Sequence, residues 1–170
     1  MAKDKIRNVQ EVNVSLVQKN GEDFICITDM AKAKTDGSRA ADVIKNWIRT
    51  RTTLEFLGTW EKIYNPSFKV VEFDHFKTQA GLPSFVLSPS QWVEKTGAIG
   101  IFSKSGRYGG TYAHRDIAFE FGSAISAEFK LYLIKEFQRL KGEESNRLKL
   151  DWNLQRTLAR VNYSIHAFKF

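Results

Sequence analysis

Residues 27–57 read ITDMAKAKTDGSRAADVIKNWIRTRTTLEFL, and the second half of this stretch predicts a helix with two opposed faces. Apolar side chains recur at the i, i+3, i+4 spacing of a buried stripe, at Ala40, Val43, Ile44, Trp47 and Ile48. Polar side chains fall on the opposite side, at Arg39, Asp42, Asn46 and Arg49, with Lys45 at the margin. We therefore expect one face in the core and the other available to a partner.

A shorter helix is expected just before this one, from Thr28 as its N-cap to about Lys34. Residues 35–38, TDGS, supply a turn between the two helices. The outline fits a helix-turn-helix unit of the kind that enters a DNA groove. It fits an ordinary pair of antiparallel helices with a solvated charged face equally well, so this stretch alone leaves both interpretations open.

A β-hairpin is predicted upstream of the two helices. Apolar and polar residues alternate from Val12 to Leu16, as in a strand with one buried face. Asn20 and Gly21 suit a tight hairpin turn, because both central residues of such a turn need positive φ. The return strand, residues 23–27, leads directly into the first helix.

The middle of the chain is predicted to be mainly helical. A helix covers about residues 52–64, and the apolar residues within 70–73 indicate a short strand or extended piece. A further helix starts at Ser88, which caps it, and Gln91 completes a capping box. Gly97, suited to a left-handed C-cap, ends that helix.

A second hairpin is predicted from residues 99–103 and 111–113, joined by the connection KSGRYGG. This connection carries Lys104, Arg107 and Tyr108 among three glycines, so it forms a flexible basic tip that can follow a phosphate backbone or enter a groove. Its glycine spacing matches neither of the common nucleotide-binding motifs. A nucleotide-binding loop is therefore the weaker interpretation.

The C-terminal third predicts helices from Asp116 onward and from after Ser126 to about Leu140, with residues 141–146 as a linker or kinked joint. Beyond them, apolar residues fall at Leu150, Leu154, Leu158, Val161, Ile165 and Phe168. The later steps alternate four and three, as in a coiled-coil seam. This seam can join two copies as a homodimer or pack back onto the chain's own helices, and the sequence leaves both open.

Composition and charge narrow the class of partner. A hydrophobic fraction of 42 % suits a folded protein, and a net charge of +7 favours a polyanion, most commonly nucleic acid. Six cationic residues fall in one stretch, at Lys32, Lys34, Arg39, Lys45, Arg49 and Arg51. Three more, with no acid among them, lie between Lys104 and Arg115.

Catalytic and metal chemistry find little support in the sequence. Cys26 is the only cysteine, which excludes an intrachain disulfide and a thiolate cluster and fits a cytosolic setting. Glu72, Asp74 and His75 lie close together, but no second ligand group with matching spacing appears. We expect no metal, no cofactor and no enzymatic activity. The N-terminus lacks a signal-peptide core and no stretch approaches the roughly 20 apolar residues of a membrane span, so we expect a cytoplasmic protein without a membrane partner.

From about Val12 to Leu140 the chain resembles the KilA-N domain, found in proteins of bacteriophages, bacteria and large DNA viruses. The segments that carry this most specifically are ITDMA at residues 27–31 and GRYGGTYAHRDIA at residues 106–118. The segments FDHF at 73–76 and FKLYLIKEF at 129–137 look similar as well. The KilA-N domain is similar in turn to the fungal APSES domain, in which a strand pair, a helix-turn-helix and a basic hairpin wing read duplex DNA.

The resemblance implies an α+β fold with small strand hairpins, a helix-turn-helix-like unit, a β-hairpin wing and C-terminal helices. It implies a DNA-binding domain over residues 1–141 and a helical extension over 142–170, which looks like the start of a truncated further region. The expected role is regulation of transcription for a phage, prophage or mobile element, in the bacterial cytoplasm or in the host cell of a virus. An RNA-binding module and a helical protein-interaction adaptor are the alternative functions.

Contacts to double-stranded DNA are implied residue by residue. The helix-turn-helix supplies Lys32, Lys34, Ser38, Arg39, Lys45, Asn46, Arg49 and Arg51. The wing and the residues behind it supply Lys104, Arg107, Tyr108, Gly109, Gly110, Thr111, His114 and Arg115. By geometry, Arg49 can fork onto a guanine and Asn46 onto an adenine, while Lys45 and Lys104 suit phosphate. The insertion between helices and wing is longer than in the fungal domain, which leaves their relative placement open.

Overall fold

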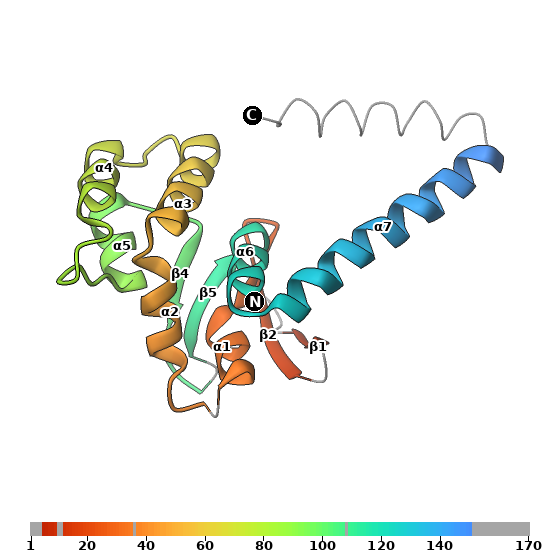
Figure 1. Ribbon diagram of the computed structural model, residues 1–170, viewed down its shortest axis with the longest axis horizontal. Helices are drawn as coiled ribbons and strands as arrows, with labels where there is room; N and C mark the ends of the chain where they lie inside the picture. Colours follow the sequence, from red (N-terminus) through yellow and green to blue (C-terminus); the bar gives the residue numbers. More distant parts are fainter. Residues whose placement is uncertain (1–4, 10–11, 36, 108, 151–170) are drawn as a thin grey trace. The chain divides into compact units, whose positions relative to one another are not determined.

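The computed structural model describes residues 5–9, 12–35, 37–107 and 109–150 (Figure 1). Its strands are β1 (Lys5–Val9), β2 (Val12–Lys19), β3 (Glu22–Cys26), β4 (Ile101–Lys104) and β5 (Gly110–His114). Its helices are α1 (Ile27–Lys34), α2 (Ala40–Ile48), α3 (Arg51–Tyr64), α4 (Val70–Gln79), α5 (Pro89–Thr96), α6 (Arg115–Ile125) and α7 (Ala127–Leu150). This mixture confirms the predicted α+β class. The chain separates into two compact units, Met1–Ala127 and Glu128–Phe170.

A single antiparallel sheet runs through the first unit, with strand order β1-β2-β3-β5-β4. The β2–β3 turn has φ of 54° at Asn20 and 78° at Gly21, which confirms the predicted hairpin. Strand β5 pairs with β3, with Cys26 opposite Tyr112, and β4 forms the edge beyond it. The two hairpins predicted at opposite ends of the helical region therefore belong to one sheet.

Helix α1 begins at Ile27, directly after β3, with Cys26 and not Thr28 as its N-cap residue. The predicted cap is wrong because the Thr28 hydroxyl has another partner: it accepts a hydrogen bond from the Thr111 N–H of β5 at 2.9 Å. Helix α2 buries Ala40, Ile44, Trp47 and Ile48, which confirms the predicted apolar stripe. Figure 1 shows α2 leading from α1 to a group formed by α3, α4 and α5.

The segment predicted as a strand at residues 70–73 is the start of helix α4, so that prediction is wrong. Val70 and Val71 are 41 % and 80 % exposed, and only Phe73 is buried in this helix. Phe73 lies against the aromatic rings of Phe68 and Trp92. The burial of one side chain against other helices, and not a two-residue alternation, decides the local conformation here.

The capping signals of α5 are confirmed. The Ser88 side chain accepts a hydrogen bond from the Gln91 N–H, the Gln91 side chain accepts one from the Ser88 N–H, and Gly97 ends the helix with φ of 69°. At the start of α3, earlier in the chain, Thr50 caps the helix by accepting a hydrogen bond from the Thr53 N–H at 3.3 Å. These caps use neighbouring residues only, which is why the sequence predicts the α5 boundaries well.

Helix α7 runs without interruption from Ala127 to Leu150, so the predicted break at residues 141–146 is wrong. Gly142 costs an exposed helix only about 1 kcal/mol, and the ion pairs Arg139–Glu143 and Lys141–Glu144 span it. The predicted domain boundary after residue 141 falls inside this helix. Most of the predicted seam from Leu150 to Phe168 lies outside the described residues. No helix of the described part of the chain is long and apolar enough to cross a membrane.

Candidate nucleic-acid interface

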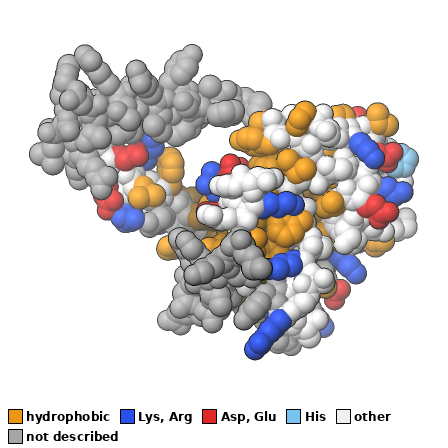
Figure 2. All heavy atoms as spheres, turned by 180° about the vertical axis from the view of Figure 1, so that it is seen from behind, with side chains coloured by type: hydrophobic (Ala, Val, Ile, Leu, Met, Phe, Trp, Pro, Cys, Tyr) orange, Lys and Arg blue, Asp and Glu red, His pale blue; other side chains and the backbone are white. Residues whose placement is uncertain are grey.

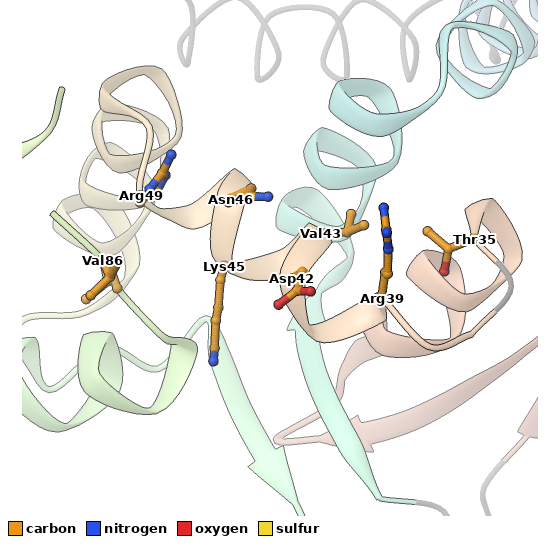
Figure 3. Close-up of a pocket in the computed structure, with 9 residues that line it drawn as sticks. Thr35, Arg39, Asp42, Val43, Lys45, Asn46, Arg49 and Val86 are labelled. Carbon is orange, nitrogen blue, oxygen red and sulfur yellow. The ribbon is translucent and has the colours of Figure 1, made fainter. Parts of the chain in front are cut away.

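The outer face of α2 carries the residues that the sequence predicts for it. Burial of Ile44, Trp47 and Ile48 fixes the rotation of the helix about its axis. As a result Arg39, Asp42, Lys45 and Asn46 are exposed, while Arg49, just past the last turn, is half-buried. Figure 3 shows these five side chains projecting from α2, with Arg39 and Lys45 pointing in opposite directions in this view.

A groove of about 660 Å³ runs along this face. One wall is α2 with Thr35, and the other is the connection between α4 and α5, represented by Val86 and Leu87 (Figure 3). The Arg49 Nη1 donates to the backbone oxygen of Phe85 at 3.5 Å, which links the two walls. Phe85 and Leu87 point into the core, whereas Val86 between them is 69 % exposed. The insertion between the helical unit and the wing therefore builds part of this groove.

The β4–β5 hairpin has a tight tip that only glycine permits. The Gly109 N–H donates to the Gly106 oxygen at 2.9 Å, and a Cβ on Gly109 would lie 2.8 Å from that oxygen and from the Lys104 oxygen. A Cβ on Gly110 would lie 3.1 Å from the Cys26 sulfur and from Thr28. Gly109 thus closes the tip, and Gly110 lets β5 lie against the start of α1.

The cations in and next to the β4–β5 hairpin differ in their exposure and in the groups around them. Arg107 is exposed, whereas the Lys104 ammonium lies 5.9 Å from the centre of the Tyr112 ring and the residue is half-buried. Arg115, at the start of α6, is exposed and its Nη2 lies 3.6 Å from Oε2 of Glu22. Tyr108 lies outside the described residues. Among the described cations around the β4–β5 hairpin, Arg107 is therefore the most available to a partner.

His114 is buried, and both of its ring nitrogens are engaged. Its Nδ1 accepts a hydrogen bond from the Asp116 N–H at 3.2 Å, so His114 caps α6. The proton is thereby assigned to Nε2, which lies 3.1 Å from Oε2 of Glu22 and donates to it. The ring also lies 5.0 Å from the Trp60 ring. In this arrangement neither ring nitrogen is free to bind a phosphate, so we do not expect His114 to contact DNA.

Helix α1 lies next to both α2 and the β4–β5 hairpin. It packs against α2 and against β5, and the Thr28–Thr111 hydrogen bond fastens its first turn to the base of the wing. Figure 1 places the α1–α2 and β4–β5 connections at the same lower end of the first unit. The cations Lys32 and Lys34 of α1 and the turn residue Ser38 are exposed. Arg51 is exposed too and pairs with Glu55 at 3.3 Å.

The charge is not confined to one continuous patch. Figure 2, which views the molecule from behind, shows Lys and Arg side chains dispersed over the surface with hydrophobic side chains between them. Some project from the lower end of the first unit, where the two connections lie. The groove beside α2 and the glycine tip are therefore distinguished by their shape as well as by their charge.

Glu61 is a structural residue of the site that sequence reasoning missed. It is 1 % exposed, and its carboxylate accepts hydrogen bonds from the Ile99 N–H at 3.0 Å, the Gly100 N–H at 2.7 Å and the Asn65 side chain at 2.9 Å. Burial raises the pKa of the Glu61 carboxyl above its usual value, and these hydrogen bonds oppose that rise. The bonds hold the chain as it enters β4, so Glu61 fastens the start of the β4–β5 hairpin to α3.

The sequence does contain a signal for this residue. Leu54, Leu57 and Glu61 follow one another at i, i+3 and i+7, which places the carboxylate on the apolar side of α3. A Cβ on Gly100 would lie 2.5 Å from Ile117 and 3.0 Å from the Glu61 carboxylate. The glycine therefore lets the backbone approach the buried charge.

Comparison with known proteins gives one match. The family model described as the KilA-N domain matches residues 8–143 of this chain. No curated protein and no solved structure matches it. Among the described residues, no group of three or more His, Cys, Asp and Glu side chains is placed to hold a metal ion.

Proposed function

Since the chain belongs to the KilA-N domain family, whose members are DNA-binding domains, we propose that it binds duplex DNA with α2 in the major groove and the β4–β5 hairpin as a wing. The observation that carries this proposal is the groove beside α2, which presents four exposed polar side chains from one face of one helix. No enzymatic step is part of it.

The dimensions of α2 support the docking mode. A helix with its side chains is about 10–12 Å wide, and the major groove of B-DNA is about 12 Å wide. From Arg39 to Arg49 the helix rises about 15 Å, which spans about four base-pair steps. Arg49 suits a guanine and Asn46 an adenine, because each side chain can form two hydrogen bonds with that base edge.

Phosphate contacts are assigned to cations around this face and on the wing. In our proposal Lys45 and Arg39 neutralise the backbone beside the groove, with Lys32, Lys34 and Arg51 at its ends. Ser38 donates from the turn. The proposed wing contacts are Lys104, Arg107, Tyr108, Thr111 and Arg115, with Gly109 and Gly110 shaping the hairpin.

The test measures duplex affinity by fluorescence anisotropy over a range of salt. Each cation that engages a phosphate contributes about −0.9 to the slope of log K against log salt, so four to six of these eight cations on phosphates at one time give a slope of roughly −4 to −5. Replacing Arg39 and Lys45 by Ala is expected to reduce affinity at least tenfold and to flatten the slope by roughly 2. Both side chains are exposed, so the fold should survive.

The matched control replaces Lys69 and Lys95, two exposed lysines outside the groove, by Ala. It removes the same charge and should leave affinity within about threefold of the wild type. Equal losses for both pairs would show that only net charge matters and would refute the docking mode. Competition with single-stranded RNA of equal length tests the RNA alternative, which predicts that RNA displaces the duplex.

The regulatory role and the oligomeric state are further parts of the proposal. We assign the protein to transcription control in a phage, prophage or mobile element, on the strength of the family resemblance. A homodimer through residues 150–168 would bring two DNA-binding units to one duplex. Light scattering of the full chain, compared with a variant carrying Asp at Leu158 and Val161, tests this: a mass of one chain for the wild type would contradict it.

A further inference from the structure

An acidic residue lies at the centre of the surface that would enter the DNA. At about 100° per residue, Asp42 projects opposite the middle of the stripe formed by Ala40, Ile44 and Trp47. Arg39 and Asn46 flank it on one side and Lys45 on the other. In Figure 3 the Asp42 carboxylate lies between Arg39 and Lys45, along the groove.

The Asp42 carboxylate is also available. It is exposed, and no hydrogen bond or ion pair within the described part of the chain engages it. Arg39 and Lys45 lie three residues before and after it, a spacing at which ion pairs form on helices, yet their side chains point away from each other in Figure 3. The cations around Asp42 are therefore not used to neutralise it.

A carboxylate at this position interacts differently with the phosphates of DNA and with the base edges in the major groove. Against a phosphate it is repelled, because both groups are negative and the carboxylate can only accept hydrogen bonds. Against the floor of the major groove it meets guanine N7 and O6 and thymine O4, which are also acceptors, or the amino groups of cytosine and adenine, which are donors. Only an amino group gives Asp42 a favourable partner.

We propose that Asp42 is a specificity-determining residue that accepts a hydrogen bond from the N4 amino group of a cytosine. This rests on the proposed docking of α2 in the major groove. Cytosine is the base whose amino group suits a single carboxylate, since an adenine presents its amino group beside the N7 acceptor, which a carboxylate disfavours. The cations on either side then meet the flanking phosphates.

The experiment selects bound duplexes from a random pool with the full chain and with two variants. Asp42→Ala removes the carboxylate, and Asp74→Ala removes another exposed carboxylate from α4, outside the groove. The wild type and the Asp74→Ala chain are expected to enrich the same site, which holds one invariant C·G pair for Asp42 in addition to the pairs that Arg49 and Asn46 select. Asp42→Ala should lose the preference at that pair alone. Measured on the selected duplex and its C·G to T·A derivative, the preference should fall about tenfold.

Other results would overturn the inference in different ways. Tighter binding of every sequence alike by Asp42→Ala would place the carboxylate against phosphates. Loss of preference at an adenine would reject cytosine as the partner base, and an unchanged site would remove Asp42 from the interface. If no chain enriches any duplex, duplex binding itself is refuted, and the role of Asp42 is refuted with it.

Discussion

Removing the buried carboxylate of Glu61 should destabilise the first unit more than any exposed acid does. Glu61→Ala leaves the N–H groups of Ile99 and Gly100 and one N–H of Asn65 without their acceptor. An orphaned buried donor costs about 1–3 kcal/mol, so the buried Gly100 N–H and Asn65 amide together would cost about 2–6 kcal/mol, and the part-buried Ile99 N–H adds a smaller amount. Relief of the carboxylate's own desolvation and entry of water offset part of this, and we expect a net loss of about 3–5 kcal/mol.

The Glu61→Gln variant separates the contribution of the hydrogen bonds to stability from the contribution of the negative charge. The amide oxygen can still accept from Gly100 and Ile99, but the amide nitrogen then faces the Asn65 amide, and two donors meet. Asn65 cannot flip cheaply, because its oxygen accepts from the Ser67 N–H and its nitrogen donates to the Gly97 oxygen. We expect a loss of about 1–3 kcal/mol, smaller than that of the Ala variant.

Urea unfolding followed by tryptophan fluorescence measures both changes as a shifted midpoint at constant slope. Glu55→Ala is the matched control, since Glu55 lies on the same helix, is half-exposed and pairs only with exposed Arg51. It should cost at most about 0.5 kcal/mol. If Glu61→Ala were no more destabilising than Glu55→Ala, the carboxylate would not hold the entry to β4, and the reasoning would fail.

The raised pKa of Glu61 also predicts whether the free energy of unfolding rises or falls with pH. Because burial raises this pKa in the folded protein, the folded state keeps its proton at pH values where the unfolded chain has lost it. Stability from this group is therefore full below the ordinary pKa near 4.5 and is lost as pH rises through the raised value. The free energy of unfolding of the wild type should fall relative to Glu61→Gln across that range. A rise would show that the hydrogen bonds outweigh desolvation.

Three further predictions concern side-chain packing. Burial raises the pKa of the Cys26 thiol, so iodoacetamide at pH 8 should label Cys26 only at the rate at which the protein opens; labelling as fast as in urea would contradict this. Gly110→Ala places a Cβ 3.1 Å from the Cys26 sulfur, and should weaken duplex binding at least fivefold, whereas Gly142→Ala, in open space, should not. Gly58→Ala places a Cβ 2.3 Å from the Phe73 ring and should cost about 1–3 kcal/mol in urea unfolding, with Phe73→Leu in the same chain restoring part of the loss.

The sequence predicted best those features that neighbouring residues decide. The Asn20–Gly21 turn and the Ser88 capping box need only two to four adjacent residues, and both were correct. The buried stripe of α2 could be predicted equally well, since the apolar residues of a helix that faces a core recur every three or four positions whatever the helix packs against. From such signals the class of fold and the outer face of α2 follow.

What the sequence could not supply depends on partners distant along the chain. The Thr28 hydroxyl prefers Thr111, 83 residues away, to the cap of its own helix. His114 faces Glu22 across 92 residues, which changes it from an expected surface contact to a buried cap. Residues 70–73 are a third case. Phe73 packs against the ring of Phe68, which is close in the chain, and the ring of Trp92, which is more distant in it, and its burial there outweighs the strand propensity of the segment. No local pattern contains this information.

The pairing of β3 with β5 has a consequence for synthesis of the protein. Cys26 pairs with Tyr112, which is the 86th residue to leave the ribosome after it. At about 5–20 residues per second this takes roughly 4–17 s. Throughout that interval one side of β3 exposes unpaired N–H and C=O groups that another strand can capture. The β3 edge of the sheet is therefore completed only after the β4–β5 hairpin has been synthesised.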